Sequence, residues 1–374
     1  MTPCDARGMP SRRTILAALV AAHGGALPAA PTAGTPASDS SVPALLRFPR
    51  DFGAHPESRT EWWYVTGALA AGERLWGFQI TFFRAATPVA GAEASRFAAR
   101  ELLFAHGAVS DLAARRLRHD QRIARSGFGI AEAAIDDTAL VLRNWRLARS
   151  GGAGASRYAA RATSDSAGFA YDLELAATQP VMLQGQGGVS RKGPRAEQTS
   201  RYYSEPQLAV RGTLALDGRS VDVSGRAWLD HEWSDAYLDP GAVGWDWIGM
   251  NLDDGSALMA FRMRRADGST LWSGGSHRVA GRATRDFADG EVVFTPGRTW
   301  ISAASSARYP VEWSVVTPVG RFGVRALLDD QELDSRTSTG AIYWEGLSLL
   351  VDAAGTAVGR GYLEMTGYAA RLVL

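Results

Sequence analysis

Bulky apolar side chains recur at every second position over many short segments of this 374-residue chain. Between residues 76 and 82, Trp76, Phe78, Ile80 and Phe82 share one parity, which places all four on one face of a β-strand. Comparable segments follow at residues 140–147, 171–175, 208–216, 221–233, 245–252, 257–263, 311–316, 322–328 and 341–351. The pattern predicts an all-β protein.

Short turn signals separate these segments. Asp-Gly pairs occur at Asp217-Gly218 and Asp289-Gly290, among others, and this pair favours the tight turns of antiparallel hairpins. About sixteen to eighteen short strands are expected, more than one eight-stranded barrel around a single small ligand would use. We therefore predict two packed antiparallel β-domains, residues 45–236 and 237–374.

The N-terminus has the features of an export signal. The sequence Ser11-Arg12-Arg13-Thr14 precedes an apolar run at residues 16–22, as in twin-arginine signals and in some Sec-type signals. We assign residues 1–30 to a signal peptide and the residues 31–44, rich in Pro, Ala, Ser and Thr, to a disordered linker. The expected location is periplasmic or secreted.

Composition and charge exclude several classes of protein. The formal net charge is +1, which argues against a nucleic-acid partner. Cys4 is the only cysteine and lies in the expected signal peptide, so no disulfide is expected in the mature chain. No later segment reaches the roughly 20 apolar residues of a membrane-spanning helix, so no integral span is expected.

Several catalytic signatures are missing. The chain has no Gly-x-Ser-x-Gly elbow, and His231-Glu232 lacks a second histidine four residues on. The histidines show no metal-ligand spacing, and neither a P-loop nor a dinucleotide-binding glycine motif is present. We therefore expect neither a metal nor an organic cofactor.

Acids, an imidazole and indoles gather between residues 230 and 247. In Asp230-His231-Glu232-Trp233, strand alternation sends His231 and Trp233 to one face and the two acids to the other. His231 could be a core residue bonded to a backbone carbonyl, or part of a site. Asp230 and Glu232 could equally form a solvated or arginine-paired face.

The second half of this segment reads Gly244-Trp245-Asp246-Trp247. An aspartate in an apolar setting has its pKa raised, because burial disfavours the charged form. Such a group can deliver a proton near neutral pH. The alternative is an Asp246 that only accepts backbone hydrogen bonds. In Trp62-Trp63, alternation places one indole inward and one outward, for core packing or for ligand contact.

Four blocks of the chain resemble the family of carotenoid 1,2-hydratases (hydroxyneurosporene synthases) and AttH-like secreted proteins labelled hydrolases. They occur in family order and extend from about residue 45 to the end. The blocks are Arg59-Thr60-Glu61-Trp62-Trp63-Tyr64 with Trp76-Gly77-Phe78-Gln79, Arg191-Lys192-Gly193 with Ser200-Arg201-Tyr202-Tyr203-Ser204, Trp228-Leu229-Asp230-His231-Glu232-Trp233-Ser234 with Gly244-Trp245-Asp246-Trp247, and Tyr343-Trp344-Glu345-Gly346 with Gly361-Tyr362-Leu363-Glu364-Met365-Thr366-Gly367-Tyr368.

This resemblance implies two packed lipocalin-like β-barrels and a small hydrophobic ligand. It implies cofactor-free addition of water to an isolated isoprenoid double bond, in which an acid protonates the alkene and water captures the carbocation. We assign the acid to Asp246, with His231 beside it, and Asp230 or Glu232 as the other candidates. The expected substrate-binding residues are Trp233, Trp245, Trp247, Trp62, Trp63 and Tyr203.

A non-catalytic function is the alternative to a hydratase. An exported protein would not meet carotenoid intermediates, which are made on the cytoplasmic side of the membrane. The resemblance also implies neighbouring genes for lipid-export ABC transporters, so the alternative is a periplasmic lipocalin-like carrier with a possible ABC-transporter partner. A hydrolase is a third, weaker reading. Fold alone does not separate these functions.

Overall fold

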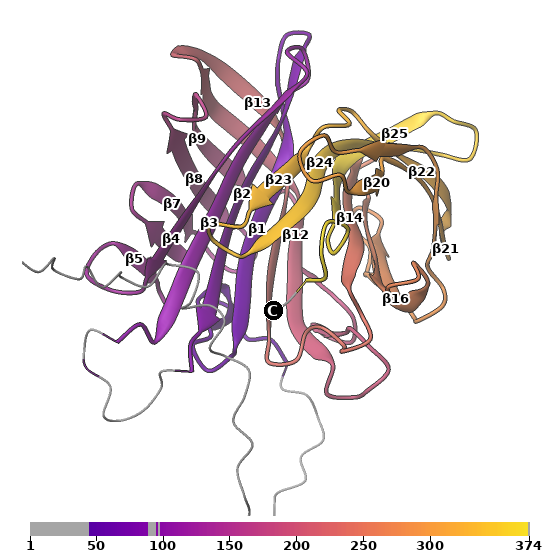
Figure 1. Ribbon diagram of the computed structural model, residues 1–374, viewed down its shortest axis with the longest axis horizontal. Coiled ribbons are helices and arrows are strands. Elements are labelled where there is room, and N and C mark those ends of the chain that lie inside the picture. Colours follow the sequence, from indigo (N-terminus) through magenta and orange to yellow (C-terminus); the bar gives the residue numbers. More distant parts are fainter. Residues whose placement is uncertain (1–44, 89–94, 96–97, 373–374) are drawn as a thin grey trace, which may run out of the picture. The chain divides into compact units, whose positions relative to one another are not determined.

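Antiparallel strands β1 to β13 form one sheet, in the order β4-β3-β2-β1-β13-β12-β9-β8-β7-β6-β5, with β10 and β11 pairing beside β12. In this computed structural model, which describes residues 45–88, 95 and 98–372, β6 lies against β3 and β4, so the sheet nearly closes into a barrel (Figure 1). Its strands are β1 (Thr60–Ala71), β2 (Arg74–Ala86), β3 (Glu101–Asp111), β4 (Arg116–Arg125), β5 (Ala131–Ala133), β6 (Ala139–Leu142), β7 (Trp145–Ser150), β8 (Arg157–Ser164), β9 (Phe169–Ala176), β10 (Met182–Leu183), β11 (Val189–Arg191), β12 (Thr199–Leu216) and β13 (Arg219–Ser234).

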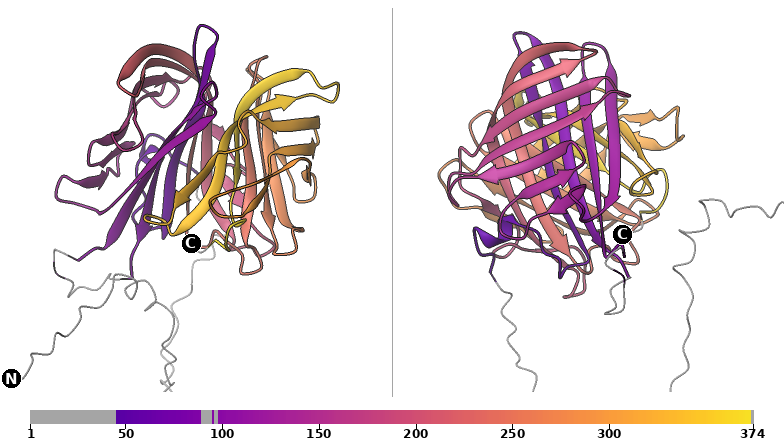
Figure 2. Two further views of the ribbon diagram at one scale, coloured as in Figure 1. Left: turned by 45° about the horizontal axis from the view of Figure 1, so that its top comes forward. Right: turned by 90° about the vertical axis from the view of Figure 1, so that its left-hand side faces the viewer.

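A second antiparallel sheet follows, in the order β17-β16-β15-β14-β25-β24-β22-β21-β18, with β23 pairing beside β24 and a separate β19-β20 pair. The two large sheets lie side by side (Figure 2), and the all-β, lipocalin-like architecture is confirmed. The strands are β14 (Gly244–Leu252), β15 (Ala257–Arg264), β16 (Thr270–Arg278), β17 (Arg285–Phe287), β18 (Val293–Pro296), β19 (Thr299–Ile301), β20 (Arg308–Pro310), β21 (Glu312–Thr317), β22 (Gly320–Ala326), β23 (Glu332–Ser335), β24 (Ala341–Val351) and β25 (Ala357–Met365).

The first sheet ends at Ser234 and the second begins at Gly244. The predicted domain boundary falls in this connection, and both sheets belong to one compact unit, Ala44–Leu374. Helix is confined, within the described residues, to the short 3-10 turn η2 (Arg50–Phe52). None of the helices described there is long and apolar enough to cross a membrane. The expected signal peptide and linker lie outside the described residues.

The turns explain both a correct prediction and an error. Asp217 and Gly218 form a two-residue hairpin loop with φ of 49° and 78°, the left-handed pair that such turns require. The segment 140–147, predicted as one strand, is a hairpin of β6 and β7 that turns at Arg143, with φ of 58°. No glycine marks this turn, so the apolar alternation seemed to continue across it.

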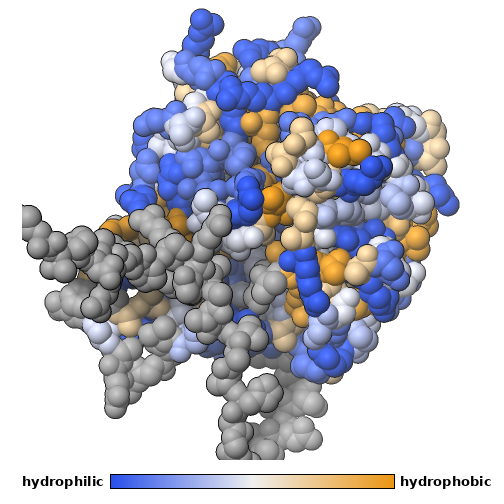
Figure 3. All heavy atoms as spheres, in the orientation of Figure 1, coloured by the Kyte–Doolittle hydropathy of each residue, from blue (hydrophilic) through white to orange (hydrophobic). Residues whose placement is uncertain are grey.

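Strand β1 is buried on both faces, because the two sheets pack against each other along it. Trp63 and Val65 belong to the core of the first barrel. Tyr64, on the other face, belongs to a second cluster with Trp247 and Tyr362 from the second sheet. Figure 3 shows apolar side chains gathered on the visible face along this junction. The junction therefore has apolar walls contributed by both sheets.

The neighbouring tryptophans of β1 should differ in their effect on stability. Trp63 is buried in the first core, whereas Trp62 is only partly buried and faces the junction. Trp63→Ala should lower the free energy of unfolding by about 3 to 5 kcal/mol, because it leaves a cavity in a packed core. Trp62→Ala should cost clearly less. Urea unfolding midpoints of both variants test this, and equal losses would contradict the assignment of faces.

Candidate functional site

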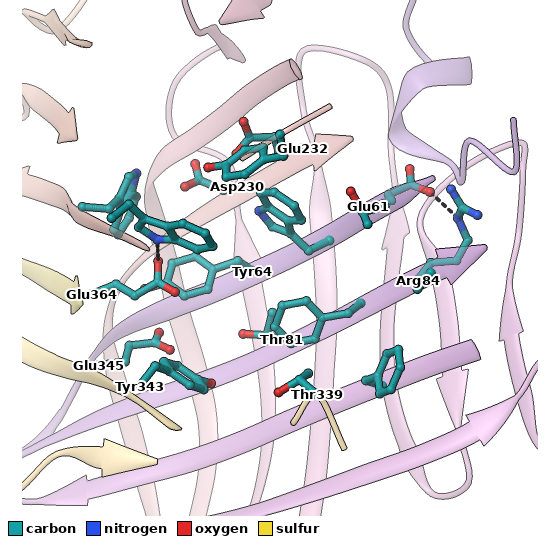
Figure 4. Close-up of a pocket in the computed structure, with 18 of the residues that line it drawn as sticks. Glu61, Tyr64, Thr81, Arg84, Asp230, Glu232, Thr339, Tyr343, Glu345 and Glu364 are labelled. Atoms are coloured by element: carbon teal, nitrogen blue, oxygen red, sulfur yellow. Dashed lines mark hydrogen bonds and ion pairs between the residues drawn. The ribbon is translucent and has the colours of Figure 1, made fainter. Parts of the chain in front are cut away.

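A partly enclosed pocket of about 240 Å³ lies between the two sheets. Strands β1, β2, β3, β12 and β13 contribute one side, and β14, β24 and β25 contribute the other. Four of its carboxyl groups, Asp230, Glu232, Glu345 and Glu364, approach from both sheets, with Tyr64 between them in Figure 4. Its aromatic walls are Trp62, Tyr64, Phe83, Phe104, Tyr202, Tyr237, Trp245, Trp247 and Tyr343.

Two of the carboxyl groups come from β13, where alternation turns Asp230 and Glu232 to the pocket side. Asp230 accepts hydrogen bonds from the Tyr202 hydroxyl at 2.7 Å, the Ser204 hydroxyl at 2.5 Å and the Trp228 indole at 2.6 Å. Glu232 forms an ion pair with Lys192, with Oε1 and Nζ 2.8 Å apart. Asp230 thus has its acceptor capacity largely used, and Glu232 has a counterion.

Lys192 is the only lysine of the chain and is almost fully buried. Its ammonium lies 4.7 Å from the ring centroid of Tyr202, 5.2 Å from that of Tyr237 and 4.4 Å from that of Phe261. Aromatic faces attract a cation electrostatically. The three rings and Glu232 together hold this charge in a place where water is scarce.

The other two carboxyl groups face each other across neighbouring strands of the second sheet. Glu345 on β24 is directly opposite Glu364 on β25, a position in which Cβ atoms are about 4.5 to 5.5 Å apart. Glu345 accepts a hydrogen bond of 2.6 Å from Gln79. Glu364 accepts one of 3.0 Å from the Trp245 indole and keeps part of its surface exposed in the pocket.

Burial changes the proton affinity of these acids. It raises the pKa of Asp230 to about 7, against the opposing effect of its three hydrogen bonds. It raises the pKa of Glu364 to about 7 as well, with a smaller contribution from the charges of Asp230 and Glu232. Burial and the neighbouring Glu364 raise the pKa of Glu345 well above its usual range. The pocket therefore contains carboxyl groups that hold protons near neutral pH.

The opposite face of β13 borders a second buried network, whose Glu61 and Arg84 also line the pocket. His231 Nε2 and His55 Nδ1 lie 2.8 and 2.7 Å from the same oxygen of Glu61. Arg84 donates to the other Glu61 oxygen at 2.8 Å. Burial opposes the charge of Glu61, but the hydrogen bonds from the two histidines hold its pKa below the usual range. Burial lowers the pKa of His231 to about 4.

Aromatic side chains enclose this network. Trp233 stacks on His55 with ring centroids 3.6 Å apart, and Trp63 stacks on His231 at 4.4 Å. Tyr203 Oη lies 3.1 Å from His231 Nδ1. Trp63, Trp233 and Tyr203 thus pack in the first barrel and hold His231 rather than lining the pocket.

His55, Glu61 and His231 also have the composition of a metal-binding triad, with ligand atoms within 4.8 Å of one another. Their separations of 2.7 and 2.8 Å are those of hydrogen bonds. Arg84 already occupies the second oxygen of Glu61. A metal ion would have to displace these bonds and sit beside a guanidinium, so we interpret the triad as a proton-linked ionic network.

Asp246 points away from the pocket, and its expected role needs correction. Trp245 and Trp247 line the pocket, so alternation turns Asp246 into the second barrel. There it is fully buried, receives a hydrogen bond of 2.7 Å from Arg262 and one of 2.8 Å from Tyr368. Both of its carboxylate oxygens are thus engaged inside the second sheet. His231 and Asp246 therefore do not share a cavity.

The pocket brings together about half of the residues expected from the sequence. Asp230, Glu232, Trp62, Trp245 and Trp247 line it. His231, Trp233, Trp63 and Tyr203 lie in the first barrel, and Asp246 in the second. Sequence reasoning missed Glu345, Glu364 and Tyr64 as site residues, although each is flanked by apolar or aromatic neighbours in a strand-like segment.

Comparisons with known proteins agree with this architecture. The model of the AttH-like family matches residues 40–368. A protein designated AttH from Nitrosomonas europaea is 48% identical, with a TM-score of 0.80 over 87% of this chain and 98% of that one. Kievitone hydratase from Nectria haematococca is 16% identical, with a TM-score of 0.65 over 89% and 95%, which shows a shared fold alone. None of the curated proteins matches the chain.

Proposed function

The chain belongs to the AttH-like family, and we propose that it is a cofactor-free hydratase that adds water to an isolated double bond of an isoprenoid or other apolar substrate. The observation that carries the proposal is the pocket between the sheets, where aromatic walls surround carboxyl groups with raised pKa values. Its fold is shared with kievitone hydratase.

We assign the acid to Glu364. Its side chain is partly exposed in the pocket, and only one of its oxygens accepts a hydrogen bond from the described residues, from Trp245. Its pKa of about 7 lets it hold a proton at neutral pH and still release it. Asp230 has a similar pKa, but three donors already occupy its oxygens.

With Glu364 as the acid, hydration of the alkene proceeds in two steps. The Glu364 proton moves to the less substituted alkene carbon, the π electrons form the new C–H bond, and a tertiary carbocation results. The faces of Trp62, Trp245 and Trp247 stabilise that cation electrostatically. A water molecule then forms the C–O bond, and the proton it loses returns to a pocket carboxylate. No electron donor or acceptor is required.

Incubation with acyclic isoprenoid alkenes in heavy-oxygen water tests the proposal. A hydratase should give an alcohol that carries one heavy oxygen per added water, detected by mass spectrometry. Heat-denatured protein provides the control. Binding of the alkene without labelled product, or co-purification of an unchanged lipid, would instead indicate a carrier.

The rate should depend on pH with a defined sign. Glu364 must be protonated to act, and burial raises its pKa to about 7. The value of kcat/KM should therefore be constant below that pH and fall about tenfold per pH unit above it. A profile that rises with pH through neutrality would assign a base, not an acid, to the rate-determining step.

A further inference from the structure

Among the described residues, two buried polar atoms on the pocket wall lie near each other but make no hydrogen bond of ordinary length and angle. They are the hydroxyl oxygen of Tyr64 and the Oε1 atom of Glu345. Tyr64 is 6% exposed and Glu345 is 2% exposed, and both residues line the pocket. Tyr64 comes from the first sheet and Glu345 from the second, so the junction of the sheets brings a hydroxyl and a carboxyl group to one place.

Other polar side chains around Glu345 are already engaged. Gln79 donates to Glu345 Oε2 at 2.6 Å and approaches the Tyr343 hydroxyl at 3.3 Å. The Tyr343 hydroxyl also lies 2.8 Å from His106 Nδ1. Among the described residues that line the pocket, the Tyr64 hydroxyl and Glu345 Oε1 are therefore the two buried side-chain atoms that lack such a bond.

A pure hydrocarbon would leave these atoms unpaired when it fills the pocket. Each buried polar group that stays unpaired weakens binding by roughly five- to 150-fold. A ligand hydroxyl removes the problem, because its oxygen can accept hydrogen bonds from both the Tyr64 hydroxyl and the protonated carboxyl group of Glu345. Sites built to bind a hydroxyl discriminate strongly against analogues that lack it.

We propose that the substrate is an unsaturated alcohol whose hydroxyl group binds between Tyr64 and Glu345. This inference rests on the proposed function, since it adds a substrate class to the same pocket. Glu345 is directly opposite Glu364 across the strand pair. An alcohol anchored at Glu345 therefore presents to Glu364 a double bond only a few carbon atoms from its hydroxyl.

The size of the pocket limits the length of this alcohol. One water occupies about 30 Å³ in the liquid, so the pocket of about 240 Å³ accommodates an alcohol of roughly eight or nine heavy atoms. Sulcatol, an eight-carbon alcohol with one trisubstituted double bond, is a suitable probe. The hydrocarbon of the same skeleton without the hydroxyl is its matched partner.

The test measures the affinity of both probes for the full chain and for Tyr64→Phe, by displacement of a fluorescent apolar ligand. The ratio of alcohol to hydrocarbon affinity should fall at least tenfold in Tyr64→Phe. Differences in water solubility cancel, because they are the same for both proteins. Removal of an unpartnered hydroxyl should leave the fold intact, which a thermal melt checks.

Tyr158→Phe is the matched control. Its hydroxyl is also buried and unpartnered, but Tyr158 lies in the first barrel and does not line this pocket. The affinity ratio should be unchanged in that variant. An equal ratio in the wild-type protein and Tyr64→Phe would overturn the inference while leaving the hydratase proposal intact. If neither probe binds the wild-type protein, and acyclic alkenes are not hydrated either, the proposed function itself is overturned.

Discussion

Glu364→Gln should lower kcat for hydration by about 10² to 10⁴-fold, the usual contribution of a positioned general acid. The glutamine keeps the size of the side chain, and its amide oxygen can still accept the hydrogen bond from Trp245. It carries no ionisable proton, so the fall of kcat/KM above pH 7 should disappear from the residual activity. Steady-state kinetics over a range of pH measure both effects.

Two further variants make this result specific. Glu174→Gln removes an exposed carboxylate paired with Arg211 on the surface and should leave kcat unchanged. Asp246→Asn separates the two assignments of the acid, because Asp246 pairs with Arg262 inside the second barrel. It should reduce stability more than kcat when assayed well below its melting temperature. A loss of kcat confined to Asp246→Asn would reject Glu364 as the acid.

The fold could be predicted because its signals are local. Alternation along β1 and β2 follows from the pleat of a strand, and the Asp217-Gly218 turn has a strong sequence preference. The turn at Arg143 was missed because a left-handed arginine has no such preference. Local signals therefore gave the class of fold and most strands, whereas an unmarked turn merged β6 with β7.

The candidate site could be predicted only in part, because it forms where the two sheets pack. Alternation along β14 places Asp246 on the face opposite Trp245 and Trp247. It could not tell which face of β14 borders the pocket and which borders the second core. That choice depends on Arg262, which is opposite Asp246 on β15. A partner sixteen residues away supplies the counterion, and no local pattern shows it.

Glu345 and Glu364 illustrate the same limit. Each is an acid inside an apolar, aromatic segment, which is a visible sign of a buried carboxyl group. Their pairing depends on the register of β24 against β25. Their approach to Asp230 depends on how the second sheet packs on the first. Sequence patterns thus identify buried acids but do not show which of them meet.

The buried network around Glu61 should contribute strongly to the stability of the fold, and Arg84 supplies its guanidinium. Arg84 is 1% exposed and donates to Glu61 at 2.8 Å and to the carbonyl of Ser58 at 2.7 Å. Arg84→Met removes the cation and leaves a buried carboxylate with less compensation. The free energy of unfolding should fall by about 3 to 5 kcal/mol, as measured by urea unfolding at pH 7.

An exposed ion pair provides the control for this prediction. Arg211 pairs with Glu174 at 2.9 Å, with side chains that are 74% and 68% exposed. Arg211→Met should cost less than about 1 kcal/mol, because solvent screens an exposed pair. If Arg84→Met and Arg211→Met lowered the free energy of unfolding equally, burial would not strengthen the ion pair between Arg84 and Glu61.

Acidification should narrow the difference in the free energy of unfolding between the wild-type protein and Arg84→Met. Hydrogen bonds from His231 and His55 hold the pKa of Glu61 below its ordinary value of 4.5. Glu61 therefore contributes stability that is present above pH 4.5 and is lost as the pH falls towards the folded-state pKa. Without Arg84 that pKa is lowered less, so the variant loses less stability on acidification. A difference in the free energy of unfolding that stays constant as the pH falls to the folded-state pKa of Glu61 would mean that Arg84 acts through packing and not through the charge of Glu61.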